Sequence, residues 1–338
     1  MIHVGVDLHQ RFCYMTALDA RGKRLGAAPV TNEKLALRKY FRQFRGQAVQ
    51  VAVEACGFWP AFREVVEPEV KRLVLVHPQR VKAIASAKLK NDRVDSATLA
   101  HLLRCDLLPE SWKADRETQA RRQQVRLRAT LVRQRTRLKN QVHAVLHQQG
   151  LRSPVTDLFG KRGRLWLREV KLPEQARESV GACLRMIDCY TEEIQKQTLQ
   201  LSEKAKQDER VQWLMTIPGI GEVSAMMVLA EIGDLGRFAD QEGLCSYAGL
   251  VPRVRESAGK AARGGITRQG SPWLRWMMVE AAQVATRTSP AARRYYERLL
   301  RKKHKHVARV ALARKLLTAV YALLKNGVMF DEEKFAAR

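Results

Sequence analysis

Acidic residues in apolar segments are the first residues of this sequence that could carry out chemistry. Asp7 stands in the segment HVGVDLH, and Glu54 closes the segment VQVAVE. Side chains alternate between the two faces of a β-strand, so each acid projects from the face opposite the neighbouring valines. An unpaired carboxylate at such a position is costly, and a bound metal ion would remove that cost. We therefore interpret Asp7 and Glu54 as metal ligands.

A second acidic pair lies in the segment KNDRVDSATLA. Asp92 and Asp95 are three residues apart at the predicted start of a helix, so their side chains share one helix face. The alternative is that they only cap the helix and stabilise its dipole. Together with the two strand acids the pair is far more specific, and hard oxygen ligands favour Mg²⁺ or Mn²⁺ over Zn²⁺. Two such ions about 4 Å apart can support phosphodiester exchange.

Glycine turns and basic residues in the C-terminal third are of the kind that handle phosphates. The segment IPGIG is typical of a helix-hairpin-helix turn, in which backbone N–H groups approach a phosphate; an ordinary helical hairpin is the alternative. Ser257 follows in a glycine-rich, basic segment, 252–270, which we expect to be a flexible loop. On spacing alone, a serine in such a loop is more often structural than catalytic. The residues expected to contact nucleic acid are Gly219, Gly221, Arg255, Gly259, Lys260, Arg263, Arg268 and Arg275.

The acids of the first hundred residues need a sheet to position them. Alternating apolar residues predict the strands, and a helical pattern covers residues 31–45. The turn DARG predicts a hairpin, so the first three strands should form an antiparallel meander, after which helices and strands alternate. We therefore expect an α/β fold with a mixed sheet. The strands are expected at residues 2–8, 12–18, 23–29, 47–54 and 73–76.

The middle of the chain changes to helix-forming residues rich in Arg and Gln. One long helix is expected from about residue 117 to Gly150, and a second at about 174–210, with Pro154 and residues 160–163 in the loop between them. The two helices would pair as a coiled-coil arm that serves oligomerisation, nucleic-acid contact or both. The apolar stripe of the first helix is Val125, Leu127, Leu131, Val132, Leu138, Val142 and Leu146.

Three domains follow from these patterns. Residues 1–112 form the α/β domain with the acids, residues 113–210 the helical arm, and residues 211–338 a mostly helical domain with the serine.

The charge balance indicates the class of partner. The chain has 61 Lys and Arg against 34 Asp and Glu, a net charge of +27 distributed along most of its length. A polyanionic partner, above all nucleic acid, is expected; a highly soluble surface or a patch for acidic membranes are the alternatives. No segment approaches the roughly 18 apolar residues of a membrane helix, and no secretory signal is visible. Six cysteines without a CxxC pair indicate reduced, mostly buried thiols in a cytoplasmic protein.

Motifs at both ends of the chain resemble one known family. GVDLH, VEACG and NDRVDSATLA resemble the DEDD domain of the insertion-sequence-110 transposases, which are related to Piv-type DNA invertases. IPGIG, YAGLVPR, ESAGK, GGIT and QGSPWLR resemble the C-terminal domain of the same family. The order of the acidic elements also resembles the ribonuclease-H-like fold of RuvC-type resolvases.

The resemblance implies a reaction and its partners. Ser257, in a Ser-x-Gly pattern with Gly259, would attack a DNA phosphate and form a phosphoserine link, with Ser246 and Ser271 as nearby alternatives. Dimers or tetramers would join the metal site of one subunit to the serine of another, and a non-coding bridge RNA would choose donor and target DNA. The implied magnesium ligands are Asp7, Glu54, Asp92 and Asp95.

Two other functions remain open from the residues alone. A structure-specific nuclease, such as a junction resolvase, would use the same acids with water as the nucleophile, so Ser257→Ala would leave its cleavage intact. A non-catalytic DNA- or RNA-binding protein with a degenerate acidic cluster would show no dependence on magnesium.

Overall fold

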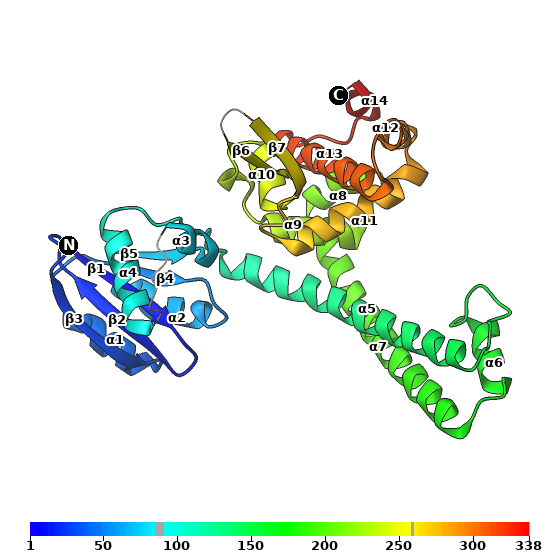
Figure 1. Cartoon of the computed structure of the whole chain (residues 1–338), viewed down its shortest axis with the longest axis horizontal. Helices are drawn as coiled ribbons and strands as arrows, with labels where there is room; N and C mark the ends of the chain where they lie inside the picture. The colour runs from blue at the N-terminus through cyan, green and yellow to red at the C-terminus, as the bar shows by residue number, and fades with distance from the viewer. Residues whose placement is uncertain (85–90, 258–259, 338) are drawn as a thin grey trace. The chain divides into compact units, whose positions relative to one another are not determined.

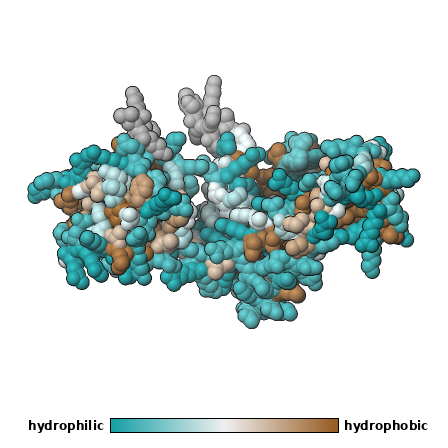
Figure 2. Space-filling view, turned by 90° about the horizontal axis from the view of Figure 1, so that it is seen from below, coloured by the Kyte–Doolittle hydropathy of each residue, from teal (hydrophilic) through white to brown (hydrophobic). Residues whose placement is uncertain are grey.

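The chain forms two compact units, Met1–Lys113 and Ala114–Arg338 (Figure 1). The computed structural model describes residues 1–84, 91–257 and 260–337, except for the side chains at 83 and 254–263. In this described part, no helix combines the length and the apolar character needed to cross a membrane. The face shown in Figure 2 is mostly hydrophilic, with hydrophobic residues scattered among the polar ones.

The first unit is built on a five-stranded sheet in the order β3-β2-β1-β4-β5. The strands are β1 (Ile2–Leu8), β2 (Phe12–Leu18), β3 (Arg24–Thr31), β4 (Val49–Glu54) and β5 (Arg72–Val76). The first three strands pair antiparallel, whereas β1 with β4 and β4 with β5 are parallel. The predicted mixed sheet with an antiparallel meander is therefore confirmed.

Helices cover both faces of this sheet. On one face, valines of β1 and β4 pack against α1 (Lys34–Arg42) and α2 (Trp59–Val66). On the other face, Ala52 and residues of β5 pack against α4 (Asp92–Arg104). The short helices η1 (Glu67–Glu69) and α3 (Pro78–Ile84) flank β5 in the chain. The acids lie on the face that α4 covers, because they alternate with the valines.

The second unit begins with two long paired helices, α5 (Arg116–Gln148) and α7 (Glu174–Lys206). Both were predicted, but the intervening loop also contains α6 (Lys161–Glu169), which the sequence did not indicate. One position of the predicted apolar stripe is wrong, since the Leu127 side chain is 48% exposed. Val125 is buried, and two positions along a helix turn the side chain by roughly 200°, so both cannot face the same partner.

The remainder of the second unit is a helical bundle with one β-hairpin. The hairpin, β6 (Pro252–Ser257) and β7 (Lys260–Ile266), corrects the flexible loop expected at 252–270. Its strands alternate charged and small residues instead of apolar ones, so the usual strand pattern was missing. The other elements are α8 (Glu209–Met215), α9 (Glu222–Ile232), η2 (Leu235–Arg237), α10 (Gln241–Tyr247), α11 (Pro272–Thr288), α12 (Pro290–Leu300), α13 (Lys305–Asn326) and α14 (Glu332–Ala337).

Candidate active site

A close approach between β1 and α4 sets the geometry around Asp7. A Cβ atom built on Gly5 would lie 2.0 Å from the carbonyl oxygen of Ser96 and 2.4 Å from the backbone nitrogen of Ala100. Only glycine leaves room for the helix backbone at this distance. A buried 2.8 Å hydrogen bond between the hydroxyls of Thr16 and Ser96 ties α4 to the neighbouring strand β2. The first turn of α4 is thereby held beside the C-terminal end of β1.

The acids at the start of α4 are not its caps. The side chain of Asn91 accepts a 2.9 Å hydrogen bond from the backbone N–H of Val94, which is the capping interaction of this helix. Asp92 and Asp95 lie in the first turn, where the helix dipole favours negative charge. Capping therefore does not explain this acidic pair, although the dipole does stabilise it.

Asp7, His9 and Asp92 form a tight group. One potential ligand atom of each lies within 4.8 Å of the others, the arrangement of a possible metal site among the described residues. The Nε2 atom of His9 is 3.4 Å from Asp7 Oδ2 and 3.3 Å from Asp92 Oδ2. β1 and α4 thus bring together two of the four predicted ligands, Asp7 and Asp92, and His9 lies beside them.

Electrostatics at Asp7 favour a bound cation. Burial raises the pKa of Asp7 above its ordinary value; His9 lowers it, and the negative charges of Asp92 and Asp95 raise it further. Asp95 is therefore near enough to act on Asp7, although it lies outside the tight group. A divalent cation would compensate three carboxylates that otherwise repel one another.

Glu54 is the neighbour of Asp7 across the sheet. The parallel register pairs Val6 with Val53, so the next residues, Asp7 and Glu54, lie side by side on the face that α4 covers. Glu54 is half-buried and, like Asp95, lies outside the tight group. The donor set of carboxylate oxygens and one imidazole fits a divalent cation.

His9 is the residue of this group that the predicted site lacked. The signal was present, because residues 5, 7 and 9 alternate onto one strand face.

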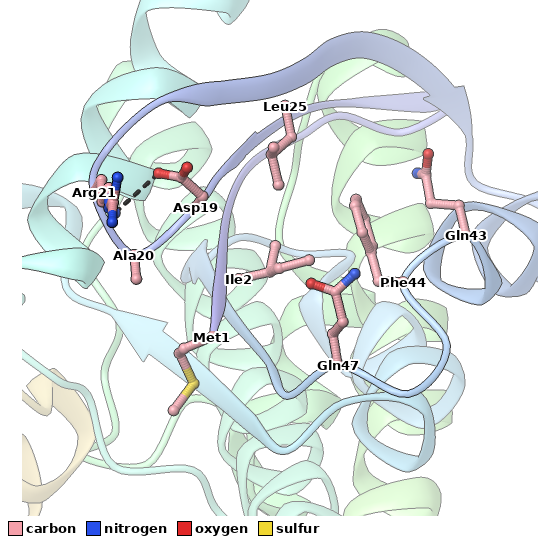
Figure 3. A pocket seen from close by; sticks show the side chains of 9 residues that line it. All are labelled: Met1, Ile2, Asp19, Ala20, Arg21, Leu25, Gln43, Phe44 and Gln47. Carbon is pink, nitrogen blue, oxygen red and sulfur yellow. Dashed lines mark hydrogen bonds between the residues drawn. The ribbon is translucent and has the colours of Figure 1, made fainter.

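A pocket shown in Figure 3 lies at the opposite end of β1 from Asp7. It is lined by Met1, Ile2 and Asp19 among others. It is separate from the acidic cluster.

Ser257 is the last residue of β6, and it pairs with Lys260 across the hairpin. The base of the hairpin continues into a backbone ladder, in which Thr267 donates to Val251 (2.9 Å) and Ser271 donates to Tyr247 (2.8 Å). This ladder fixes where the hairpin leaves the bundle. Gly259 lies outside the described residues, and so do the side chains of Arg255, Ser257, Lys260 and Arg263.

The two alternative serines differ in their surroundings. Ser271 is buried; its hydroxyl donates to Glu231 Oε2 (2.8 Å) and accepts from the backbone N–H of Leu274, which caps α11. These bonds give Ser271 a structural role. Ser246 is exposed on α10.

Two predicted nucleic-acid residues already have protein contacts. Arg275 is half-buried and donates to the carbonyl of Ala248 (2.9 Å); burial, and then Arg268, lower its pKa. Gly219 has a φ of +87°, and a Cβ on it would lie 2.2 Å from the carbonyl oxygen of Ala281, so packing against α11 requires this glycine.

Two other residues of the predicted set are exposed. Gly221 precedes α9 as its N-cap, and Arg268 follows β7 with a φ of 55°. Contact between these residues and nucleic acid stays a prediction.

Comparisons with known proteins agree with this arrangement. Residues 4–150 match the family of DEDD transposases of the IS110 type, and residues 211–297 match the family described as "Transposase IS116/IS110/IS902 family". A "Probable family 20 transposase" of Pseudomonas aeruginosa is 28% identical over 86% of this chain and 87% of its own length. The transposase for insertion sequence element IS1111A of Coxiella burnetii is also 28% identical, over 95% and 89%. A pilin gene-inverting protein of Moraxella bovis is 34% identical over 37% and 40%.

The mixed sheet with its acidic cluster and the two family matches define the class as DNA transposase. The chain belongs to the IS110 family, the transposases of insertion sequences. DNA is therefore its partner, and the DEDD family suggests the use of a divalent metal. Among the described residues, Asp7, His9 and Asp92 form a group that could hold such an ion.

Proposed function

We propose that this transposase exchanges DNA strands with Mg²⁺ or Mn²⁺ held by the four acids and with Ser257 as the nucleophile. The proposal is supported by the placement of acids from β1, β4 and α4 on the same side of the sheet. Asp7 and Asp92 lie in one tight group, Asp95 acts on the pKa of Asp7, and Glu54 is the strand neighbour of Asp7.

The architecture also supports the three domains that the sequence predicts and the fold expected for each. The strand order β3-β2-β1-β4-β5, with only β2 antiparallel to both of its neighbours, supports a ribonuclease-H-like, RuvC-like domain over residues 1–112. The pairing of α5 with α7 supports a coiled-coil arm over residues 113–210. The α8–α9 turn supports a helix-hairpin-helix in the serine domain over residues 211–338.

The proposed chemistry divides between the two units. A bound divalent cation would supply positive charge to the phosphate and to the oxygens that enter and leave. The four carboxylates hold this charge in place, and the hairpin presents Ser257. As the Ser257 Oγ–P bond forms, a P–O bond of the DNA breaks, and the serine proton passes to the leaving oxygen. The number of phosphoester bonds is unchanged, so no external energy source is needed.

We also propose the partners that the family resemblance implies. The net charge of +27 supports binding of a non-coding bridge RNA in addition to DNA. A homo-oligomer, a dimer or tetramer, would join the metal site of one subunit to Ser257 of another. The setting would be the prokaryotic cytoplasm, with action at the nucleoid.

A covalent-adduct assay tests this function. The full-length protein is incubated with DNA of the element ends and the flanking non-coding RNA, with and without Mg²⁺, and the adduct is mapped by mass spectrometry. We expect a DNA adduct on Ser257 that needs Mg²⁺ and is lost in Ser257→Ala. Ser246→Ala is the matched control, because Ser246 is an exposed serine of the same unit, and it should retain the adduct.

The assay also separates this proposal from a water-dependent nuclease. Cleavage by Ser257→Ala at the wild-type rate, without any adduct in the wild type, would mean that water is the nucleophile. An adduct that forms equally well in EDTA would contradict the role of the acids.

A further inference from the structure

We propose that His9 is a nitrogen ligand of the divalent cation at this site, together with Asp7 and Asp92. The inference rests on the function proposed above and adds a residue beyond the four acids. It makes the site a mixed nitrogen and oxygen site instead of one made of carboxylates alone.

The distances around Nε2 are those of ligands to one ion. Ligand atoms at about 2.1 Å from a common cation lie roughly 3.0 Å apart at right angles and roughly 3.4 Å apart at the tetrahedral angle. The Nε2 atom of His9 is 3.4 Å from Asp7 Oδ2 and 3.3 Å from Asp92 Oδ2. Three donor atoms already stand where a single ion can reach all of them with only small movements.

A hydrogen bond explains these distances less well. Charge-assisted N–H···O bonds are typically about 2.7–2.9 Å long, shorter than both contacts of Nε2. One N–H group can also point its hydrogen at only one acceptor. Here two carboxylates approach the same nitrogen from different elements, β1 and α4. An ion between the three groups satisfies both acids at once.

The ring of His9 is held in this position by its surroundings. The backbone N–H of His9 donates to the carbonyl of Phe12 (3.0 Å), and its carbonyl accepts from the side-chain amide of Asn32. The ring packs against that of Phe12, with centroids 5.1 Å apart. Because these contacts order the residue before any ion binds, less conformational entropy is lost on binding.

A nitrogen ligand changes the preference of the site among cations. Mg²⁺ is bound almost entirely by oxygen, whereas transition-metal cations accept imidazole readily. His9 should therefore contribute more to the affinity for Mn²⁺ than to that for Mg²⁺. Mn²⁺ is also the useful probe, because it is paramagnetic.

The experiment is pulsed electron paramagnetic resonance of Mn²⁺ bound to the full-length protein, without nucleic acid. A directly bound imidazole gives a ¹⁴N hyperfine coupling, which we expect in the wild type and expect to be lost in His9→Gln. Glutamine keeps a polar group but is a poor ligand. His101→Gln is the matched control, because His101 is an exposed histidine at the other end of α4, and it should keep the coupling.

Calorimetric titration gives the second readout. In His9→Gln the affinity for Mn²⁺ should fall by at least about tenfold, and that for Mg²⁺ by less than about threefold. The thermal unfolding of His9→Gln in EDTA checks its fold; because His9 is exposed, we expect little change.

The outcomes separate this inference from the proposed function. Mn²⁺ binding that Asp7→Asn abolishes but that shows no ¹⁴N coupling would overturn the role of His9 and leave the acids in place. Equal Mn²⁺ binding by His9→Gln would also overturn it, since His9 would then contribute nothing to the affinity. Tighter binding would mean that His9 competes with the metal for the acids. Failure of the wild type to bind any divalent cation would overturn the proposed function itself.

Discussion

Asp7 combines a cost to stability with its proposed role as a metal ligand. It lies on a largely apolar strand, and burial together with Asp92 and Asp95 raises its pKa. Perturbed acids of this kind cluster at functional sites, because the folded protein tolerates there a charge that only a ligand compensates. The cost should therefore be visible when the metal is absent.

Asp7→Asn should stabilise the metal-free protein while abolishing its function. Since the pKa of Asp7 is raised on folding, the folded protein binds its proton more tightly than the unfolded chain does. The destabilisation is absent below the unfolded pKa of 3.8, and it grows as the pH rises through the folded pKa. In EDTA at neutral pH, Asp7→Asn should unfold at a higher temperature than the wild type, with the difference shrinking towards pH 4. Its strand exchange should fall by at least about 100-fold.

Added Mg²⁺ is the internal control for this comparison. It should raise the unfolding temperature of the wild type and leave that of Asp7→Asn nearly unchanged, because only the former binds the ion. A lower unfolding temperature for Asp7→Asn in EDTA would show that the Asp7 carboxylate stabilises the fold, contrary to this account.

The sequence predicts some of these residues better than others. Strand alternation and helical spacing place Asp7, Glu54, Asp92 and Asp95 on surfaces that can meet, because both periods are local properties of the backbone. The proximity of His9 to Asp92 depends on how closely α4 approaches β1, which no local pattern encodes.

The contact between α4 and β1 determines whether the proposed metal site can form. Gly5 is the residue that permits the contact, since even a single methyl group would collide with the backbone of α4. The same glycine thus links the packing of the sheet to the spacing of the acids.

Gly5→Ala should displace α4 and weaken metal binding. Overpacking of this kind costs about 1–3 kcal/mol, and the shift would separate Asp92 from Asp7. Gly26→Ala is the matched control, because Gly26 lies in β3 with open space where its Cβ would stand. Chemical denaturation and Mn²⁺ titration of both variants provide the measurement. Equal stability and affinity in the two variants would mean that the approach of α4 is unimportant.

An ion pair joins the long helix α5 to the bundle. Arg126 donates to both carboxylate oxygens of the fully buried Glu231, at 2.7 and 2.9 Å, and Glu231 also accepts from Ser271 at the base of the hairpin. Arg126→Met would leave the buried carboxylate without its cation, which costs about 3 kcal/mol.

Chemical denaturation measures this cost. Arg137→Met, on an exposed position of the same helix, should change the free energy of unfolding by no more than about 0.5 kcal/mol. If both variants lost the same small amount, the ion pair would not stabilise the junction of α5 and the bundle.

Some helices and strands were predicted from the sequence, and others were missed. The strands of the first unit and the two long helices were predicted because apolar residues recur along them. The β6–β7 hairpin was missed because its strands carry charged and small residues, and α6 because Gly163 and its neighbours are typical of a loop. In these segments, tertiary contacts outweigh local preference.

The proposed reaction needs both units of the chain and more than one subunit. If the acids of one subunit act with Ser257 of another, then mixing two inactive variants should restore adduct formation. After subunits exchange at random between the Asp7→Asn and Ser257→Ala dimers, half of the dimers contain one chain of each variant. Each of these mixed dimers has one intact site out of two. The adduct yield should therefore reach about a quarter of that of the wild type.

One outcome of the mixing experiment would contradict the prediction. The variants are combined after exchange of subunits, and the adduct is quantified against each variant alone. No adduct in the mixture, with subunit exchange shown by differently tagged chains, would place the acids and the serine of each reaction in one subunit.

The proposed reaction depends on four acids from β1, β4 and α4 that hold a divalent cation. Anomalous diffraction from crystals of this protein soaked in Mn²⁺ would locate that cation. We predict anomalous density between the carboxylates of Asp7, Glu54, Asp92 and Asp95, within about 2.3 Å of their oxygens. Saturating Mn²⁺ with no density at these side chains, or density only elsewhere on the chain, would contradict the account.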